Sequence, residues 1–188
     1  ESNWVVLKFG GTSVSSVSNW KNVAGVVKAR LIEGLHPVIV HSALSGITDR
    51  LEQLLAKALT GEWEPVMDQI ERRHLDLARD LGIHIDAELD RHFTDLRRSA
   101  EGIHLIGEVS DRLRARVMAN GELMATRIGA AFLQAADGGI GAEFEAPLAL
   151  GPDALALHQF RDRGAEVRED APAQPRARSP LGCSPAAT

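Results

Sequence analysis

Two short apolar runs separated by one helical pattern constrain the fold of this chain most strongly. The first run is Trp4–Leu7, and the second, residues 38–43, is rich in β-branched side chains. Such runs are typical of buried strands in a parallel sheet. The segment between them predicts a helix over 18–33, with apolar residues at helical spacing at Trp20, Val23, Val27 and Leu31 and with Gly34 placed to end it. The order predicts an α/β fold that begins with a βαβ unit.

The right-handed crossover of a βαβ unit brings the carboxyl ends of both strands to the same edge of the sheet. Ligands of open α/β sheets bind at that edge. We therefore expect the loops that follow the two strands to converge there.

The first strand ends in a lysine and a glycine pair, placed in the turn between this strand and the expected helix. The text is Lys8-Phe9-Gly10-Gly11-Thr12-Ser13-Val14. Two glycines let backbone N–H groups approach an anion closely, and the lysine adds a full positive charge. This pattern indicates a phosphate site, and a tight turn beside a solvated lysine is the alternative reading.

The second strand is followed by small hydroxyl residues, among them Ser42 and Thr48. Asp49 and Glu52, three residues apart, predict an N-terminal cap for a helix that continues to about Leu59. Hydroxyl residues at a helix start are caps more often than ligands, so both interpretations of Ser42 and Thr48 stay open.

Residues 62–120 have helical periodicity and predict a long helical insertion. Asn120-Gly121 predicts a break, after which a new helix runs to about Ala136 with Glu122 in its first turn, where the helix dipole would stabilise it. The three apolar stripes of the insertion are Val66, Ile70, Leu77 and Leu81; Leu89, Phe93 and Leu96; and Ile106, Val109, Leu113 and Val117.

Composition excludes several classes of protein. The chain has 188 residues, 44% hydrophobic and 25% charged, which suits one well-buried domain. A net charge of -5 argues against nucleic-acid binding, and no apolar stretch approaches the ~20 residues of a membrane span. The single cysteine, Cys183, forms no internal disulfide, and no histidines have the spacing of a protein-bound metal site. Because no signal segment is visible, we expect a cytoplasmic location.

Three stretches carry a resemblance to a known family. Residues 8–14 resemble the opening signature of the aspartate kinases, members of the amino-acid kinase superfamily. Residues 38–51 are similar to the second signature, and 121–127 to the third. The resemblance implies an amino-acid-kinase-like (carbamate-kinase-like) fold, a parallel-rich sheet with flanking helices and a helical insertion, truncated to the N-terminal portion of the domain.

The same resemblance implies an activity and roles for particular residues. The reaction is transfer of the γ-phosphate of ATP, bound with Mg²⁺, to the side-chain carboxylate of L-aspartate, giving 4-phospho-L-aspartate, the first step towards lysine, threonine and methionine. The carboxylate is already ionised, so no general base is needed. The full-length protein is expected to be a homo-oligomer. The implied site has Lys8 as the catalytic residue, Lys8, Phe9, Gly10, Gly11 and Ser13 on the ATP phosphates, and Ser42, Thr48 and Glu122 on aspartate, with Glu122 at its α-amino group.

The domain boundaries and the activity of the chain alone stay open. We expect residues 1–150 to form the N-terminal part of a kinase domain, with a third strand near 140–146, and 151–188 to be a low-complexity, disordered tail. The adenine-binding loops and regulatory domains of the family have no match in this sequence. The alternatives are another amino-acid or carbamate kinase, which would phosphorylate glutamate or acetylglutamate, and a non-catalytic binding or subunit-interaction fragment, which neither MgATP nor aspartate would stabilise.

Overall fold

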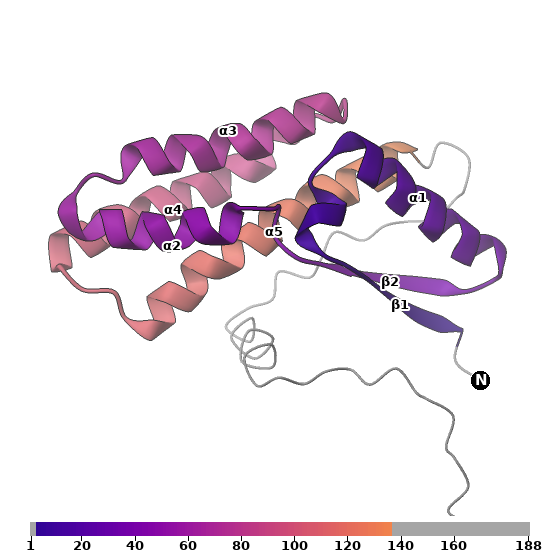
Figure 1. Cartoon of the computed structure of the whole chain (residues 1–188), viewed down its shortest axis with the longest axis horizontal. Helices are drawn as coiled ribbons and strands as arrows, with labels where there is room; N and C mark the ends of the chain where they lie inside the picture. Colours follow the sequence, from indigo (N-terminus) through magenta and orange to yellow (C-terminus); the bar gives the residue numbers. More distant parts are fainter. Residues whose placement is uncertain (1–2, 137–188) are drawn as a thin grey trace, which may run out of the picture.

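The structure, a computed structural model, describes residues 3–136, which form a βαβ unit and a helical bundle (Figure 1). The expected strand near 140–146 and the expected tail 151–188 lie outside this range. The elements of the βαβ unit are β1 (Trp4–Phe9), the 3₁₀ turn η1 (Gly11–Val14), α1 (Val17–Ile32) and β2 (His36–His41). The bundle contains α2 (Ile47–Thr60), α3 (Glu64–Asp80), α4 (Asp86–Ile106) and α5 (Asp111–Ala136).

The two strands pair in parallel, as the βαβ pattern predicts. Trp4 lies opposite His36, and the register continues without a shift to Phe9 opposite His41. The helix expected over 18–33 is α1, so strand, crossover helix and strand are all confirmed. The carboxyl ends of β1 and β2 therefore lie at one edge.

Only one face of this sheet is covered by the described helices. Leu7 and Ile39 pack against the core on the side of α1 and α5, whereas Trp4 and Val6 on the other face are 66% and 67% exposed. Alternate residues of β2 are exposed too, so the prediction of two fully buried strands is wrong for this part of the chain. The continuous apolar run identified a strand correctly, but covering both of its faces requires layers that residues 3–136 do not supply.

The helix after the glycine pair begins at Val17, one residue before the expected start at Ser18. The chain first makes the short turn η1, and α1 starts at Val17, where the side chain of Ser16 accepts a hydrogen bond from the Asn19 N–H (3.3 Å). A serine cap satisfies one of the free N–H groups of a helix end, which fixes the start of α1 at this position.

The start of α2 also differs from the prediction. Asp49 lies in the first turn, and Gly46, at φ 78°, precedes the helix without any side-chain cap. This left-handed conformation costs glycine little and turns the chain sharply from the second loop into α2. The predicted cap at Asp49 and Glu52 is therefore wrong, although the predicted helix and its end near Leu59 are confirmed.

The bundle confirms most of the apolar stripes. The predicted α3 and α4 residues are buried, apart from Leu81, which packs at the edge of the core. Ile106 is exposed, because α4 ends there and the chain turns at Gly107 before α5 begins. Among residues 3–136, no helix is long and apolar enough to cross a membrane.

Helix α5 passes through Asn120 and Gly121 without a break, so the predicted new helix at this point is wrong. Both residues are buried. Asn120 donates its side-chain N–H to the Arg116 carbonyl (3.0 Å), and its Oδ1 lies 2.9 Å from His92 Nδ1. Packing against neighbouring elements outweighs the roughly 1 kcal/mol cost of a glycine inside a helix. Glu122 therefore lies in the interior of α5 and gains nothing from a helix start.

Trp20 fills the space between α1, α5 and the end of β2. Its side chain is fully buried, and the indole N–H donates to the Val14 carbonyl (2.8 Å). Ring centroids lie 5.6 Å from His41 and 6.1 Å from Phe132. A Cβ atom on Gly129 would lie 2.2 Å from the Trp20 ring, so the indole fits only because residue 129 has no side chain.

Gly129→Ala should destabilise the fold, because the Trp20 ring is buried and cannot move away. Overpacking of this kind costs about 1–3 kcal/mol, and we expect the free energy of unfolding in urea to fall accordingly. Gly25→Ala in α1 is the matched control, since a Cβ atom added there would have nothing within 4 Å. That variant should gain up to about 1 kcal/mol from helix propensity. Equal stability of the two variants would contradict the proposed packing.

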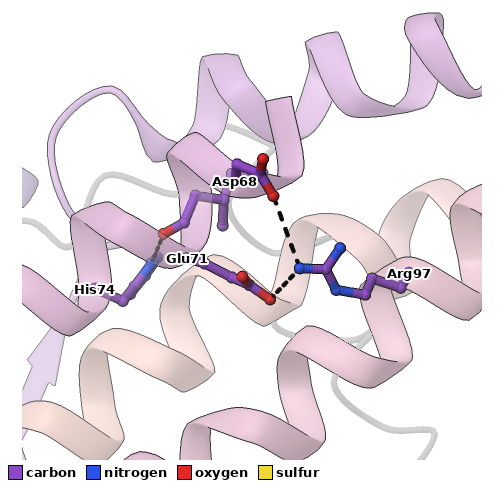
Figure 2. A network of polar contacts seen from close by, with 5 residues as sticks. Asp68, Glu71, His74 and Arg97 are labelled. Atoms are coloured by element: carbon purple, nitrogen blue, oxygen red, sulfur yellow. Dashed lines mark hydrogen bonds and ion pairs between the residues drawn. The ribbon is translucent and has the colours of Figure 1, made fainter. Parts of the chain in front are cut away.

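A polar network joins α3 and α4 beside a buried histidine (Figure 2). Arg97 pairs with Glu71 (2.6 Å) and more distantly with Asp68 (3.9 Å). His74 Nδ1 lies 2.7 Å from the Ile70 carbonyl and donates to it, while its Nε2 is buried without a partner. Burial lowers the pKa of His74 to about 4, so His74 is neutral at neutral pH.

Stability should therefore depend on pH through His74. The unfolded histidine has a pKa of 6.5 and the folded one about 4, so the unfolded chain binds more protons below pH 6.5. The free energy of unfolding should fall by about 2 kcal/mol between pH 7 and pH 5. Urea titrations of His74→Leu should show a much shallower slope, with a remainder from His41, whose pKa is also lowered by burial. The exposed His84→Gln is the control, and an unchanged slope in His74→Leu would refute the assignment.

Candidate functional site

The loops after β1 and β2 converge, as the βαβ unit predicts. The Ser42 N–H donates to the Phe9 carbonyl (3.2 Å). Beyond it, a Cβ atom on Gly11 would lie 2.7 Å from the Ala43 carbonyl oxygen, so the two backbones touch at a position that admits only glycine. The glycine pair thus has a packing role in addition to any role towards a ligand.

A serine that the sequence patterns did not single out joins the two loops. Ser15 Oγ donates to the Gly11 carbonyl (2.5 Å) and accepts a hydrogen bond from the Ser45 N–H (2.7 Å). Asn19 of α1 secures the same turn by donating to the Thr12 carbonyl (2.8 Å). No local sequence pattern predicts the contact of Ser15 with Ser45, because this contact depends on the convergence of two distant segments.

Lys8 lies near the end of β1, on the face of the sheet away from α1. Its side chain is exposed, and its neighbour in the register is Val40. Among the residues that the structure describes, Lys8 makes no hydrogen bond or ion pair. Its ammonium is therefore available to an anion at this edge, and no contact joins it to the other candidate residues.

The remaining phosphate candidates follow Lys8 along the loop. Phe9 packs its side chain against the core, so only its backbone faces the loop. Gly10 is exposed with open space around it, and the half-buried Ser13 donates its N–H to the Gly10 carbonyl (3.0 Å). This bond tightens the turn and commits the Ser13 N–H.

Glu122 of α5 lies near enough to His41, at the end of β2, for its negative charge to act on that side chain. The pKa of His41 is lowered chiefly by burial, and the Ser42 carbonyl and the negative charge of Glu122 both oppose that change. Gly121 explains the close approach of α5, since a Cβ atom there would lie 3.0 Å from both Ala43 and Leu51. Glu122, His41 and the Ser42 loop thus share one neighbourhood.

Ser42 and Thr48 differ in their surroundings. Ser42 is half-buried at the point where its N–H meets the Phe9 carbonyl. Thr48 is exposed in the first turn of α2, and no hydrogen bond within residues 3–136 joins it to the other candidates. Its hydroxyl also makes no capping bond, so the capping interpretation of Thr48 is not borne out by the geometry.

The arrangement offers the elements of anion and ammonium recognition at one sheet edge. A free lysine and a glycine turn suit phosphate, and a carboxylate suits an ammonium group. Within the described range, no group of three or more histidine, cysteine, aspartate or glutamate side chains could hold a metal ion.

The chain belongs to the amino acid kinase family, whose characteristic sequence it matches over residues 3–165. Its relatives are aspartokinases. It is 33% identical over 133 residues to aspartokinase 2, chloroplastic, of Arabidopsis thaliana, covering 68% of this chain and 24% of the relative. The aspartokinase of Chlamydia trachomatis is 30% identical over 122 residues, covering 63% and 25%.

A solved structure of an aspartokinase has a similar fold over this part of the chain. E. coli aspartokinase III, in complex with aspartate and ADP, superposes with a TM-score of 0.59 at 28% identity, over 70% of this chain and 29% of that one. The amino-acid-kinase fold expected from the sequence is therefore confirmed for this portion, as a small parallel sheet with five helices. The chain spans about a quarter of the length of the relatives named above.

Gly11→Ala should separate the two loops, because the new methyl group would meet the backbone oxygen of Ala43. The cost should be about 1–3 kcal/mol of unfolding free energy, measured in urea. Gly10→Ala is the matched control, since nothing lies within 4 Å and its φ of -74° suits any residue. We expect it to change stability by less than about 0.5 kcal/mol. A larger loss in Gly10→Ala than in Gly11→Ala would refute the close approach.

Proposed function

We propose that this chain forms the phosphate-binding and aspartate-binding part of an aspartate kinase. The reaction is transfer of the γ-phosphate of MgATP to the side-chain carboxylate of L-aspartate, giving 4-phospho-L-aspartate. The observation that carries the proposal is the direct contact between the glycine loop after β1 and the serine loop after β2, at Gly11 and Ala43. Family membership and aspartokinase relatives support it.

This phosphoryl transfer requires that the two substrates be positioned correctly and that negative charge on the phosphates be neutralised. The aspartate carboxylate is ionised at neutral pH and attacks the γ-phosphorus directly, so the site needs no general base. In this proposal Lys8 neutralises charge on the transferring phosphoryl group, while the backbone of Phe9, Gly10 and Gly11 and the hydroxyl of Ser13 hold the phosphates. Mg²⁺ enters with ATP as part of the substrate.

In this proposal the loop after β2 and helix α5 recognise the amino acid. Glu122 would pair with the α-ammonium group, and the hydroxyls of Ser42 and Thr48 would orient the acceptor carboxylate towards the phosphorus. The closeness of Glu122 to the end of β2 supports this division of roles. A homo-oligomeric parent protein and a cytoplasmic location stay predictions.

Binding to this chain, followed by calorimetry, tests the proposal. We expect L-aspartate and MgATP each to bind, with glutamate and acetylglutamate much weaker. Glu122→Gln should weaken the binding of aspartate at least about tenfold, because it removes a charged hydrogen-bond partner. The affinity for MgATP should not change. Lys8→Ala should weaken the binding of MgATP but not of aspartate, and should leave thermal stability unchanged. The exposed Lys28→Ala and Glu101→Gln are the controls.

Turnover is measured separately, by trapping the acyl phosphate with hydroxylamine. We expect aspartyl hydroxamate only when the chain is extended by the remaining parts that its relatives possess. Preference for glutamate or acetylglutamate would indicate another amino-acid kinase. If neither ligand binds, the chain is an interaction fragment and the proposal is wrong.

A further inference from the structure

Ser15 is the point at which three separate parts of the chain meet. Its Oγ joins the Gly11 carbonyl to the Ser45 N–H, which links the loop after β1 to the loop after β2. Its own carbonyl accepts a hydrogen bond from Arg73 Nη2 of α3 (2.7 Å). The helical bundle therefore holds this junction from outside the βαβ unit.

We propose that Ser15 and Arg73 are positioning residues that couple the two ligand sites. They hold the loop 10–15 and the loop 42–46 at a fixed separation, so that occupation of one loop favours binding at the other. The inference rests on the proposed function for the identity of the ligands, phosphate and aspartate. The hydrogen-bonded junction itself does not depend on that function.

The coupling follows from the ordering of irregular backbone. Each loop lies between a strand and a helix, and a ligand that binds a loop must restrict its motion. Because Ser15 Oγ uses both its donor and its acceptor across the junction, ordering of one loop restricts the other. The second ligand then loses less conformational entropy on binding, which appears as positive cooperativity without a change of fold.

Arg73 connects the helical insertion to the junction between the two loops. It lies 58 residues from Ser15 in sequence, and its guanidinium donates to a carbonyl at the end of η1. A hydrogen bond from a charged donor is stronger than one between neutral groups, and α3 is a long, packed helix. The junction therefore has a rigid anchor, and the adjacent Arg72, which is exposed, supplies a control of equal charge.

The functional test measures L-aspartate affinity with and without saturating magnesium tripolyphosphate, which carries the phosphates of MgATP without its base. We expect the wild-type chain to bind aspartate about fivefold or more tightly when tripolyphosphate is present. In Ser15→Ala this factor should fall to nearly one, while each ligand alone binds within about threefold of wild type. Arg73→Gln should reduce the factor in the same direction.

Matched variants separate positioning from general damage. Ser18→Ala removes an exposed hydroxyl whose side-chain contact is Ser16 Oγ at 3.2 Å, and Arg72→Gln removes a neighbouring charge; both should keep full coupling. Ser15→Thr keeps the hydroxyl and should restore it. Full coupling in Ser15→Ala, or equal loss in Ser18→Ala, would overturn the proposal.

A measurement without ligands distinguishes failure of the junction from failure of the proposed function. Amide hydrogen exchange of Ser45 should accelerate about fivefold or more in Ser15→Ala, because its acceptor is lost, while amides within α4 stay unchanged. Unchanged exchange at Ser45 would overturn the junction whatever the ligands do. Absence of aspartate and tripolyphosphate binding in wild type, together with accelerated exchange, would instead refute the proposed function and with it the coupling.

Discussion

The fit of the Trp20 indole against Gly129 is the constraint on which the arrangement of this chain depends. One buried side chain touches α5, the end of β2 and, through its N–H, the carbonyl of Val14. A ring held by a hydrogen bond at one end and by a bare backbone at the other has little freedom. Trp20 therefore fixes how far the glycine turn lies from α5, and α5 in turn carries Glu122 to the same edge.

The proposed site is composite. The βαβ unit supplies two loops, α5 supplies a carboxylate, and α3 supplies the arginine that holds Ser15. Figure 1 shows why this is possible, since α5 extends from the helical bundle to the side of the βαβ unit. The helical insertion therefore contributes to the junction of the loops, because Arg73 of α3 lies within it and binds the Ser15 carbonyl.

Sequence patterns predicted what depends on local periodicity and failed where distant packing decides. The β-branched run before Ser42 and the helical spacing around Trp20 were sufficient for the βαβ unit and its converging loops. Asn120-Gly121 was misleading, because the burial of Gly121 against Ala43 and Leu51 cannot be seen from the local sequence. Ser15 lay beside a recognised motif, yet its bonds to Ser45 and Arg73 depend on tertiary structure. The roles of Lys8, Thr48 and Glu122 towards ligands stay predictions.

The two close glycine contacts of α5 also limit how the chain can change in length. Gly121 faces Ala43 and Leu51, and Gly129, eight residues later, faces Trp20. Each residue turns a helix by about 100°, so a single insertion or deletion between them would rotate one contact away from its partner. Between these two glycines, α5 should therefore tolerate substitutions on its outer side far better than any change in the number of residues.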